Sequence, residues 1–401
     1  MKTPNANRKH IVFYGKRNAG KSSIMNSLIG QEVSLVSDIK GTTTDTVSKA
    51  VELIPFGPVV FVDTGGIDDQ GTLGELRIEK TKKTLESADF AIYVIDIEEI
   101  DHIEIELDQE FDKRNIPYII VINKIDQVSK ERLDIIKEKL GFRLKNKEIL
   151  YTSVEVKSTI DDLRNKLIER LETLEIEDTL IGDIVPYNGK VIMVIPIDAE
   201  APKGRLILPQ VQLIRDCLDH GIKSYVVSDR ELESAISDLK NIELVVTDSK
   251  IFKYVESMIP KDMNLTSFSI IMARQKGDLK ELIEGIDQLK SLKNKDNPRI
   301  LVMESCSHNT SHEDIGRVKI PKVINKTLGK EIEYHFAMGK DFPKNLKEYD
   351  LVIHCGSCML NKKTMFNRIR LCKEAGVPIT NYGMVLAYGA GILDRAVEIF
   401  I

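Results

Sequence analysis

The sequence predicts an α/β protein whose first domain has a doubly wound, mostly parallel sheet and is followed by two further, smaller α/β domains. In the first part of the chain, short apolar runs alternate with helical patterns, and the runs are rich in β-branched and aromatic residues. They lack polar alternation, which is typical of strands buried on both faces of a parallel sheet. The predicted strands are Ile11–Tyr14, Val59–Val62, Phe90–Ile95, Tyr118–Ile122 and Ile149–Tyr151, and the predicted helices are Ser22–Ile29, Leu73–Ser87 and Lys130–Leu140.

The remaining elements define the domain limits. A helix at Ile160–Leu174 closes the first domain, and the polar stretch Glu175–Asp183 indicates a linker. A second βαβ-like region and a third α/β region follow. Their predicted elements are Val191–Ile197, Gln210–His220, Ser224–Val227, Glu231–Lys240, Leu244–Val246, Leu279–Leu292, Ile300–Met303, Leu351–Ile353, Lys363–Ala375 and Val377–Thr380. We therefore expect domains over residues 1–174, 180–265 and 270–401.

Composition restricts the class of protein. The chain has 401 residues, 42% hydrophobic and 30% charged, and a net charge of −5. This charge gives no reason to expect nucleic-acid or membrane partners, which favour a basic surface. No signal-peptide pattern or bilayer-length apolar run is present. We expect a cytoplasmic protein whose five cysteines stay reduced and free to bind metal.

A phosphate-binding loop follows the first predicted strand. The segment Gly15-Lys-Arg-Asn-Ala-Gly20-Lys21-Ser22 stands between a strand and a helix, the context that this motif requires. Backbone N–H groups at a helix N-terminus bind anions, Lys21 would contact the β- and γ-phosphates, and the Ser22 hydroxyl would bind Mg²⁺. The residues expected to contact nucleotide here are Gly15, Asn18, Ala19, Gly20, Lys21, Ser22 and Ser23.

Motifs at other strand ends specify guanine. Asp63-Thr-Gly-Gly66 would hold Mg²⁺ through water at Asp63 and sense the γ-phosphate through the Gly66 N–H. In Asn123-Lys124-Ile-Asp126, the Asp126 carboxylate accepts both N–H donors of the guanine edge, and Lys124 lies over the base. The segment Thr152, Ser153 and Val154 would place a backbone N–H on the guanine carbonyl. The order of these motifs resembles translation-factor-like GTPases over residues 10–172.

The predicted catalytic residues are Lys21, Thr43, Asp63 and Gly66. Thr43, or alternatively Thr44, lies in a switch-like loop and would supply a second hydroxyl to Mg²⁺. Ile67 stands where signalling GTPases carry a water-positioning Gln, so we expect slow or assisted hydrolysis. Asn18 resembles the Asn of potassium-activated GTPases related to tRNA-modification GTPases, in which it helps to hold K⁺ against the phosphates.

Two cysteine clusters form a second candidate site. Cys306-Ser-His308 and His354-Cys355-Gly-Ser-Cys358 each follow a predicted strand, and strand ends at one edge of a parallel sheet lie close together. Three ligand sets are possible. Three cysteines with an exchangeable fourth ligand would hold an iron–sulfur cluster, a Cys/His set would hold structural Zn²⁺, and a Cys-x-x-Cys pair would be redox-active.

This combination of motifs resembles the GTPases that mature FeFe-hydrogenases, the HydF family, over essentially the whole chain. The resemblance implies a GTPase domain, a dimerisation domain and a domain that binds a 4Fe–4S cluster through Cys306, Cys355 and Cys358. The fourth iron position would be open or weakly held, with His308, His354, Glu313 or water as candidates. The implied cofactors are GTP or GDP, Mg²⁺, K⁺ and the cluster, and the implied cargo is a diiron precursor.

By the same resemblance, the protein is a homodimeric scaffold that receives the precursor made with two radical-SAM maturases and delivers it to apo FeFe-hydrogenase. Two alternatives remain. One is a potassium-activated GTPase with a structural zinc domain that acts in tRNA modification or ribosome assembly. The other is a GTP-regulated metal chaperone for a different metalloenzyme.

Overall fold

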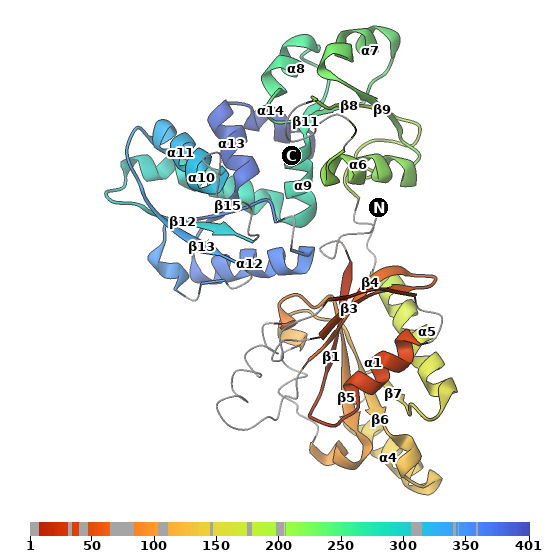
Figure 1. The fold of residues 1–401 in the computed structure, drawn as a ribbon. Coiled ribbons are helices and arrows are strands. Elements are labelled where there is room, and N and C mark those ends of the chain that lie inside the picture. Colours follow the sequence, from red (N-terminus) through yellow and green to blue (C-terminus); the bar gives the residue numbers. More distant parts are fainter. Residues whose placement is uncertain are drawn as a thin grey trace. The chain divides into compact units, whose positions relative to one another are not determined.

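Figure 1 shows the protein as a computed structural model. The structure describes residues 8–30, 34–39, 47–64, 84–102, 111–144, 147–174, 179–197, 204, 206–305, 315–339, 342–343, 345–357 and 360–401. The chain divides into two compact units, Met1–Ile176 and Glu177–Ile401.

The first unit contains a seven-stranded sheet with the order β2-β3-β4-β1-β5-β6-β7. Its strands are β1 (Lys9–Tyr14), β2 (Ser34–Ile39), β3 (Val47–Leu53), β4 (Gly57–Asp63), β5 (Phe90–Asp96), β6 (Tyr118–Asn123) and β7 (Ile149–Tyr151). β1 pairs in parallel with β4 and β5, and the parallel ladder continues through β6 to β7. β3 runs antiparallel to both of its neighbours. The mostly parallel sheet is therefore confirmed.

Helices cover both faces of this sheet (Figure 1). They are α1 (Lys21–Ile29), α4 (Lys130–Arg143) and α5 (Lys157–Leu174), with short 3₁₀ turns η2 (Ile97–His102) and η3 (Ile125–Gln127). Successive side chains of β1 point to opposite faces. Phe13 packs in one core with α1 and α5, whereas Tyr14 packs in another core with α4. This two-sided burial explains why the parallel strands are continuous apolar runs.

The second unit contains two parallel four-stranded sheets, with the orders β11-β10-β8-β9 and β13-β12-β14-β15. The strands are β8 (Lys190–Val194), β9 (Lys223–Val227), β10 (Leu244–Thr247), β11 (Leu265–Ser267), β12 (Arg299–Glu304), β13 (Glu333–Met338), β14 (Leu351–His354) and β15 (Ile379–Asn381). The helices are α6 (Leu208–Asp219), α7 (Leu232–Asp238), α8 (Phe252–Met258), α9 (Phe268–Lys276), α10 (Leu279–Ser291), α11 (Ile320–Leu328), α12 (Lys362–Ala375), α13 (Tyr382–Ala390) and α14 (Leu393–Val397). Short turns are η4 (Asp229–Glu231), η5 (Leu292–Asn294), η6 (Ile315–Lys319), η7 (Leu346–Glu348) and η8 (Glu398–Phe400).

One hydrophobic core joins the two sheets of the second unit. Val194 and Val245 of the first sheet belong to the same buried cluster as Val302 and Ile353 of the second. The opposite face of each sheet has a separate core, one with α6 and one with α12. The predicted limits at residues 265 and 270 thus fall inside one compact unit, and the division into two domains there remains a prediction.

The lengths and polarity of the helices bear on membrane insertion. Within the part of the chain that the structure describes, no helix is long and apolar enough to cross a membrane.

Candidate functional site: a nucleotide loop and a cysteine turn

The phosphate-binding loop joins β1 to α1, and two glycines let it close tightly. Gly15 has φ +146°, and a Cβ atom there would lie 2.1 Å from the Val94 carbonyl oxygen. Gly20 has φ +93°, and its Cβ would lie 2.2 Å from Nδ2 of Asn123. Both positions therefore require glycine, because a side chain would meet neighbouring strands as well as an unfavourable φ. The loop is held close against the ends of β5 and β6.

Lys21 lies at the first position of α1, and its side chain is buried. Its Nζ atom donates hydrogen bonds to the carbonyl oxygens of Gly15 at 2.9 Å and Lys16 at 2.7 Å. The ammonium group thus lies over the loop whose N–H groups would face a phosphate. The phosphate contact of this lysine remains a prediction.

Ser22 and Asp63 form a pair that fits Mg²⁺. The Ser22 hydroxyl donates to Oδ2 of Asp63, and Oδ1 of Asp63 is buried without a hydrogen-bond partner. Burial raises the pKa of Asp63, while Ser22, Lys21 and Lys49 act in the opposite direction. Hard cations such as Mg²⁺ prefer oxygen ligands, and they usually keep several waters. The Ser22 hydroxyl and the Asp63 carboxylate, whose Oδ1 accepts no hydrogen bond, supply oxygen atoms of this kind.

The guanine motifs meet at the same edge of the sheet. Nδ2 of Asn123 donates to the Ala19 carbonyl oxygen at 2.9 Å, and Thr152 Oγ1 donates to Oδ1 of Asn123 at 3.3 Å. The end of β6 is therefore bonded to both the phosphate-binding loop and the segment after β7. Asp126 is exposed in η3, as a residue that binds a base must be.

Asp96 is a further residue of this site that the sequence analysis did not identify. It ends β5 and holds Lys124, with 2.5 Å between Oδ2 of Asp96 and Nζ of Lys124. Its position at the carboxyl end of a buried parallel strand was the available signal. Lys124 itself has φ +66°. The ion pair fixes the side chain that is predicted to cover the guanine base.

The other residues predicted to contact nucleotide differ in their exposure to solvent. Ala19, Ser153 and Thr152 are buried, whereas Asn18, Ser23 and Val154 are exposed. Asn18 has φ +62°, a conformation that Asn tolerates in turns, so its exposed position is equally that of a turn residue. Thr43, Thr44, Gly66 and Ile67 lie outside the described residues.

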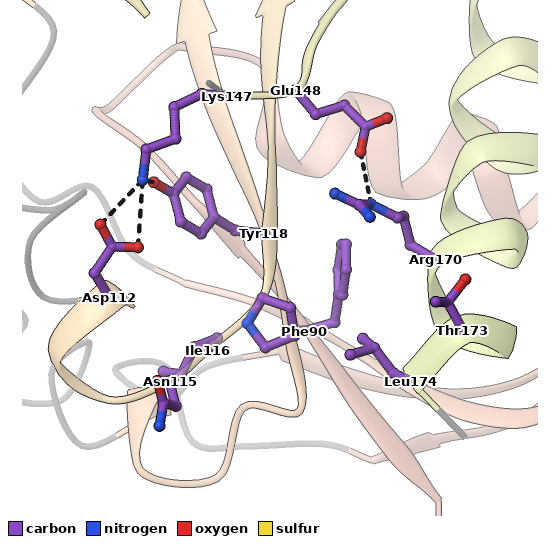
Figure 2. Close-up of a pocket in the computed structure, with 11 residues that line it drawn as sticks. Phe90, Asp112, Asn115, Ile116, Tyr118, Lys147, Glu148, Arg170, Thr173 and Leu174 are labelled. Carbon is purple, nitrogen blue, oxygen red and sulfur yellow. Dashed lines mark hydrogen bonds and ion pairs between the residues drawn. The ribbon is translucent and has the colours of Figure 1, made fainter. Parts of the chain in front are cut away.

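A cavity of about 580 Å³ lies at the amino-terminal ends of β5 and β6, opposite the strand ends that carry the nucleotide motifs (Figure 2). Phe90 and Tyr118 line it from the strands, and Arg170 lines it from α5. Its charged side chains are paired with each other: Lys147 with Asp112, and Arg170 with Glu148 (Figure 2). The cavity is thus separate from the nucleotide motifs, which follow the carboxyl ends of the strands.

The two strands that precede the cysteine clusters are neighbours in the sheet. β12 pairs in parallel with β14, so that Met303 is opposite His354, and Cys355 N–H donates to the Met303 carbonyl oxygen at 2.8 Å. The predicted proximity of the two strand ends is confirmed. Cys355 is buried, and the Ser305 N–H donates to its sulfur at 3.3 Å. Backbone N–H groups directed at sulfur are a usual feature of thiolate-ligated clusters.

His354 is fully buried beside this cysteine. Nε2 lies 2.5 Å from Nη1 of Arg368, a donor, so Nε2 accepts and the proton is assigned to Nδ1. Nδ1 lies 2.9 Å from the Cys355 carbonyl oxygen and 3.1 Å from Ser357 Oγ. Burial and the Arg368 charge lower the pKa of His354 to about 3. Iron ligation by His354 through Nε2 would require the bond to Arg368 to break.

The other predicted cluster residues, Cys306, Cys358, His308 and Glu313, lie outside the described residues. Among the residues that are described, no group of three or more His, Cys, Asp or Glu side chains could hold a metal ion. Cys217 and Cys372 are fully buried core residues, and burial raises the pKa of each thiol to about 12.

Comparison with known proteins gives relatives that are GTPases. The tRNA modification GTPase MnmE of Helicobacter pylori is 35% identical over 179 residues, which are 44% of this chain and 38% of that protein. GTPase Der of Wolinella succinogenes is 35% identical over 239 residues, 54% of this chain and 50% of that protein. The chain therefore spans about half or less of these relatives. A crystal structure of Era with MgGDPNP and 16S ribosomal RNA nucleotides aligns at 25% identity over 55% of this chain and 92% of its own, with a TM-score of only 0.34.

Family matches account for most of the chain. Residues 10–124 match the family described as 50S ribosome-binding GTPase. Residues 180–277 match the hydrogen maturase F dimerization domain, and residues 280–399 match the hydrogen maturase F tetramerization domain. The last two matches together cover more than half of the chain. With a GTPase domain followed by both of these domains, the chain belongs to the HydF-type hydrogen maturase GTPases.

Proposed function

We propose that this GTPase is an iron–sulfur scaffold and carrier, which receives a diiron precursor and delivers it to apo FeFe-hydrogenase. The turn that begins with Cys355 at the end of β14, which we call the cysteine turn, would hold the resident 4Fe–4S cluster together with the segment after β12, through Cys306, Cys355 and Cys358. The precursor would be supplied with two radical-SAM maturases. We infer a cytoplasmic protein whose basic assembly is a homodimer; the matches to a dimerization and a tetramerization domain support self-association.

The observation that carries this proposal is the pairing of β12 with β14. It places the residue before Cys306 against Cys355, since the Ser305 N–H and the Cys355 sulfur are 3.3 Å apart. Ser305 directly precedes Cys306 in the sequence, and Cys358 stands three residues after Cys355. The contact between Ser305 and Cys355 therefore supports a joint site for the three predicted ligands.

The chain's own residues would hold and shield the cluster. The Ser305 N–H donates to a ligand sulfur, which stabilises negative charge there. Burial of Cys355 and Ser357 keeps water from that side of the turn. When bound, the cluster would supply an exchangeable iron position, to which His308, His354, Glu313 or water is the candidate fourth ligand and at which cargo would attach.

Nucleotide binding would control delivery. Lys21, Ser22 and Asp63 would bind the phosphates and Mg²⁺, with Thr43 and Gly66 responding to the γ-phosphate. In GTPases, contacts to the γ-phosphate order the switch segments, and this ordering changes how partners associate. Loss of those contacts on hydrolysis would release a partner.

The test of the scaffold proposal is metal and sulfide analysis with EPR on anaerobically reconstituted, dithionite-reduced protein. We expect about four iron and four sulfide per chain, lost in Cys306→Ala. Cys217→Ala is the matched control, because Cys217 is buried in the core between α6 and the sheet that contains β8 and β10, away from the cysteine turn. One tightly bound zinc without iron would instead favour the potassium-activated GTPase with a structural zinc domain.

Potassium is proposed as an activator through Asn18. The observation in support is the 35% identity to MnmE over 179 residues, together with the exposed Asn18 in the loop. Replacing K⁺ by Na⁺ should slow GTP hydrolysis in wild type, and Asn18→Ala should remove the difference between the two ions. Equal rates in both salts for the wild type would exclude the role of Asn18.

A further inference from the structure

We propose that Arg368 is a positioning residue of the cysteine turn. It holds His354 and places a buried positive charge near the sulfur of Cys355, from which the Ser305 hydroxyl separates it. There the charge would stabilise the reduced, more negative state of the iron–sulfur cluster. The inference rests on the proposed function, because it assigns a role towards that cluster.

Arg368 lies in α12 and is only 2% exposed. An arginine is rarely buried this deeply without a specific use for its charge or its hydrogen bonds. Nη1 lies 2.5 Å from Nε2 of His354 and 3.4 Å from Oγ of Ser305. The guanidinium also packs against the ring of Phe342, with 5.3 Å from Cζ to the ring centroid. These contacts fix its plane and position.

Through these bonds, Arg368 contacts the chain at the ends of both strands that precede the predicted cysteine ligands. On β14, its bond to His354 leaves Nδ1 to donate towards the Cys355 carbonyl oxygen. Beyond β12, Ser305 Oγ lies 3.4 Å from the Cys355 sulfur as well as from Arg368. One serine therefore separates the guanidinium from a predicted ligand sulfur.

A second buried cation reaches the same turn. Lys276 ends α9, is 6% exposed, and donates from Nζ to the Ser357 carbonyl oxygen at 3.2 Å. A thiolate-ligated cluster is anionic, and nearby positive charge favours the state that carries more negative charge. Net charge and hydrogen bonds to sulfur are among the factors that set cluster potentials. Arg368 supplies charge, while the Ser305 N–H supplies the hydrogen bond.

The experiment is an EPR-monitored redox titration of the reconstituted full-length chain. Arg368→Gln removes the charge but keeps an N–H donor for His354, whereas Arg368→Lys keeps the charge. Arg370→Gln is the matched control, since Arg370 lies on the same helix, is more exposed and pairs with Glu374. We expect Arg368→Gln to lower the equilibrium constant for cluster reduction about tenfold, a shift of about 59 mV to more negative potential.

Arg368→Lys should restore most of that shift, and Arg370→Gln should show none. An unchanged potential in Arg368→Gln, or an equal fall in Arg368→Gln and Arg368→Lys, would overturn the proposal. If Arg368→Gln retains too little cluster to titrate, iron content decides: iron kept only in Arg368→Lys supports the charge, and loss in both variants refutes it. A wild type without any cluster would refute the scaffold function itself, which separates the two failures.

Discussion

The nucleotide edge of the first unit and the cysteine edge of the second are both carboxyl edges of parallel sheets, but they are built in different ways. At the nucleotide edge, one continuous loop from Gly15 to Ser22 is predicted to supply most contacts through its backbone. At the cysteine edge, side chains from β14, α9 and α12 converge on a short turn. A site made by the backbone is encoded locally, whereas one made by distant side chains depends on topology.

If the two edges are independent sites, the largest separation comes from Cys355→Ala. We expect this change to abolish cluster binding, because it removes one of the three predicted ligands and the acceptor of the Ser305 N–H. GTP hydrolysis should be unaffected, since the cysteine lies in the other unit. The measurements are iron content and GTPase rate on the same preparation. Unchanged iron content would refute the ligand assignment.

The converse change is Lys21→Ala. We expect GTP affinity to fall roughly 100-fold, about 3 kcal/mol, because a buried charged contact to phosphate is lost. Iron content should match wild type. Isothermal titration with GTP measures the first, and Lys130→Ala, an exposed lysine of the same unit, is the control. Loss of the cluster in Lys21→Ala would show that the two edges are coupled.

The strands of the nucleotide edge could be predicted from the sequence because each has a continuous apolar run with no polar alternation. β6 was predicted as Tyr118–Ile122 and is Tyr118–Asn123, and β7 was predicted with its observed limits. β13 was missed, since Tyr334, His335 and Phe336 lie in an edge strand with no fully buried residue and lack a continuous apolar pattern.

The cysteine edge was predicted only in its cysteines and histidines. Arg368 carries no signal in sequence, because a charged residue within a helix usually faces solvent. Its burial follows from packing α12 against β12 and β14, which no local pattern encodes. Lys276 is hidden for the same reason, as α9 itself was not predicted. The electrostatics of a site built from side chains therefore emerge only with the tertiary structure.

A base-specificity change sharpens the description of the nucleotide edge. Asp126→Asn replaces one of two acceptors by a donor, so it mismatches the guanine edge and instead suits xanthine, which carries a carbonyl in place of the amino group. We expect GTP affinity to fall roughly 30-fold, about 2 kcal/mol, and XTP affinity to rise. Competition binding with both nucleotides measures this, with the exposed Asp134→Asn as control. Equal loss for GTP and XTP would contradict direct recognition of the base.

The smallest expected effect concerns Asp96, which positions Lys124 without a predicted contact to nucleotide. Asp96→Asn keeps an oxygen acceptor but removes the charge, and partly exposed ion pairs contribute only about 0.2–1 kcal/mol. We expect GTP affinity to fall no more than about fivefold, with unchanged preference for GTP over XTP. A loss as large as that of Asp126→Asn would mean that Asp96 contacts the base itself. A small loss with preference kept would show that even the locally encoded edge relies on one side chain from a neighbouring strand.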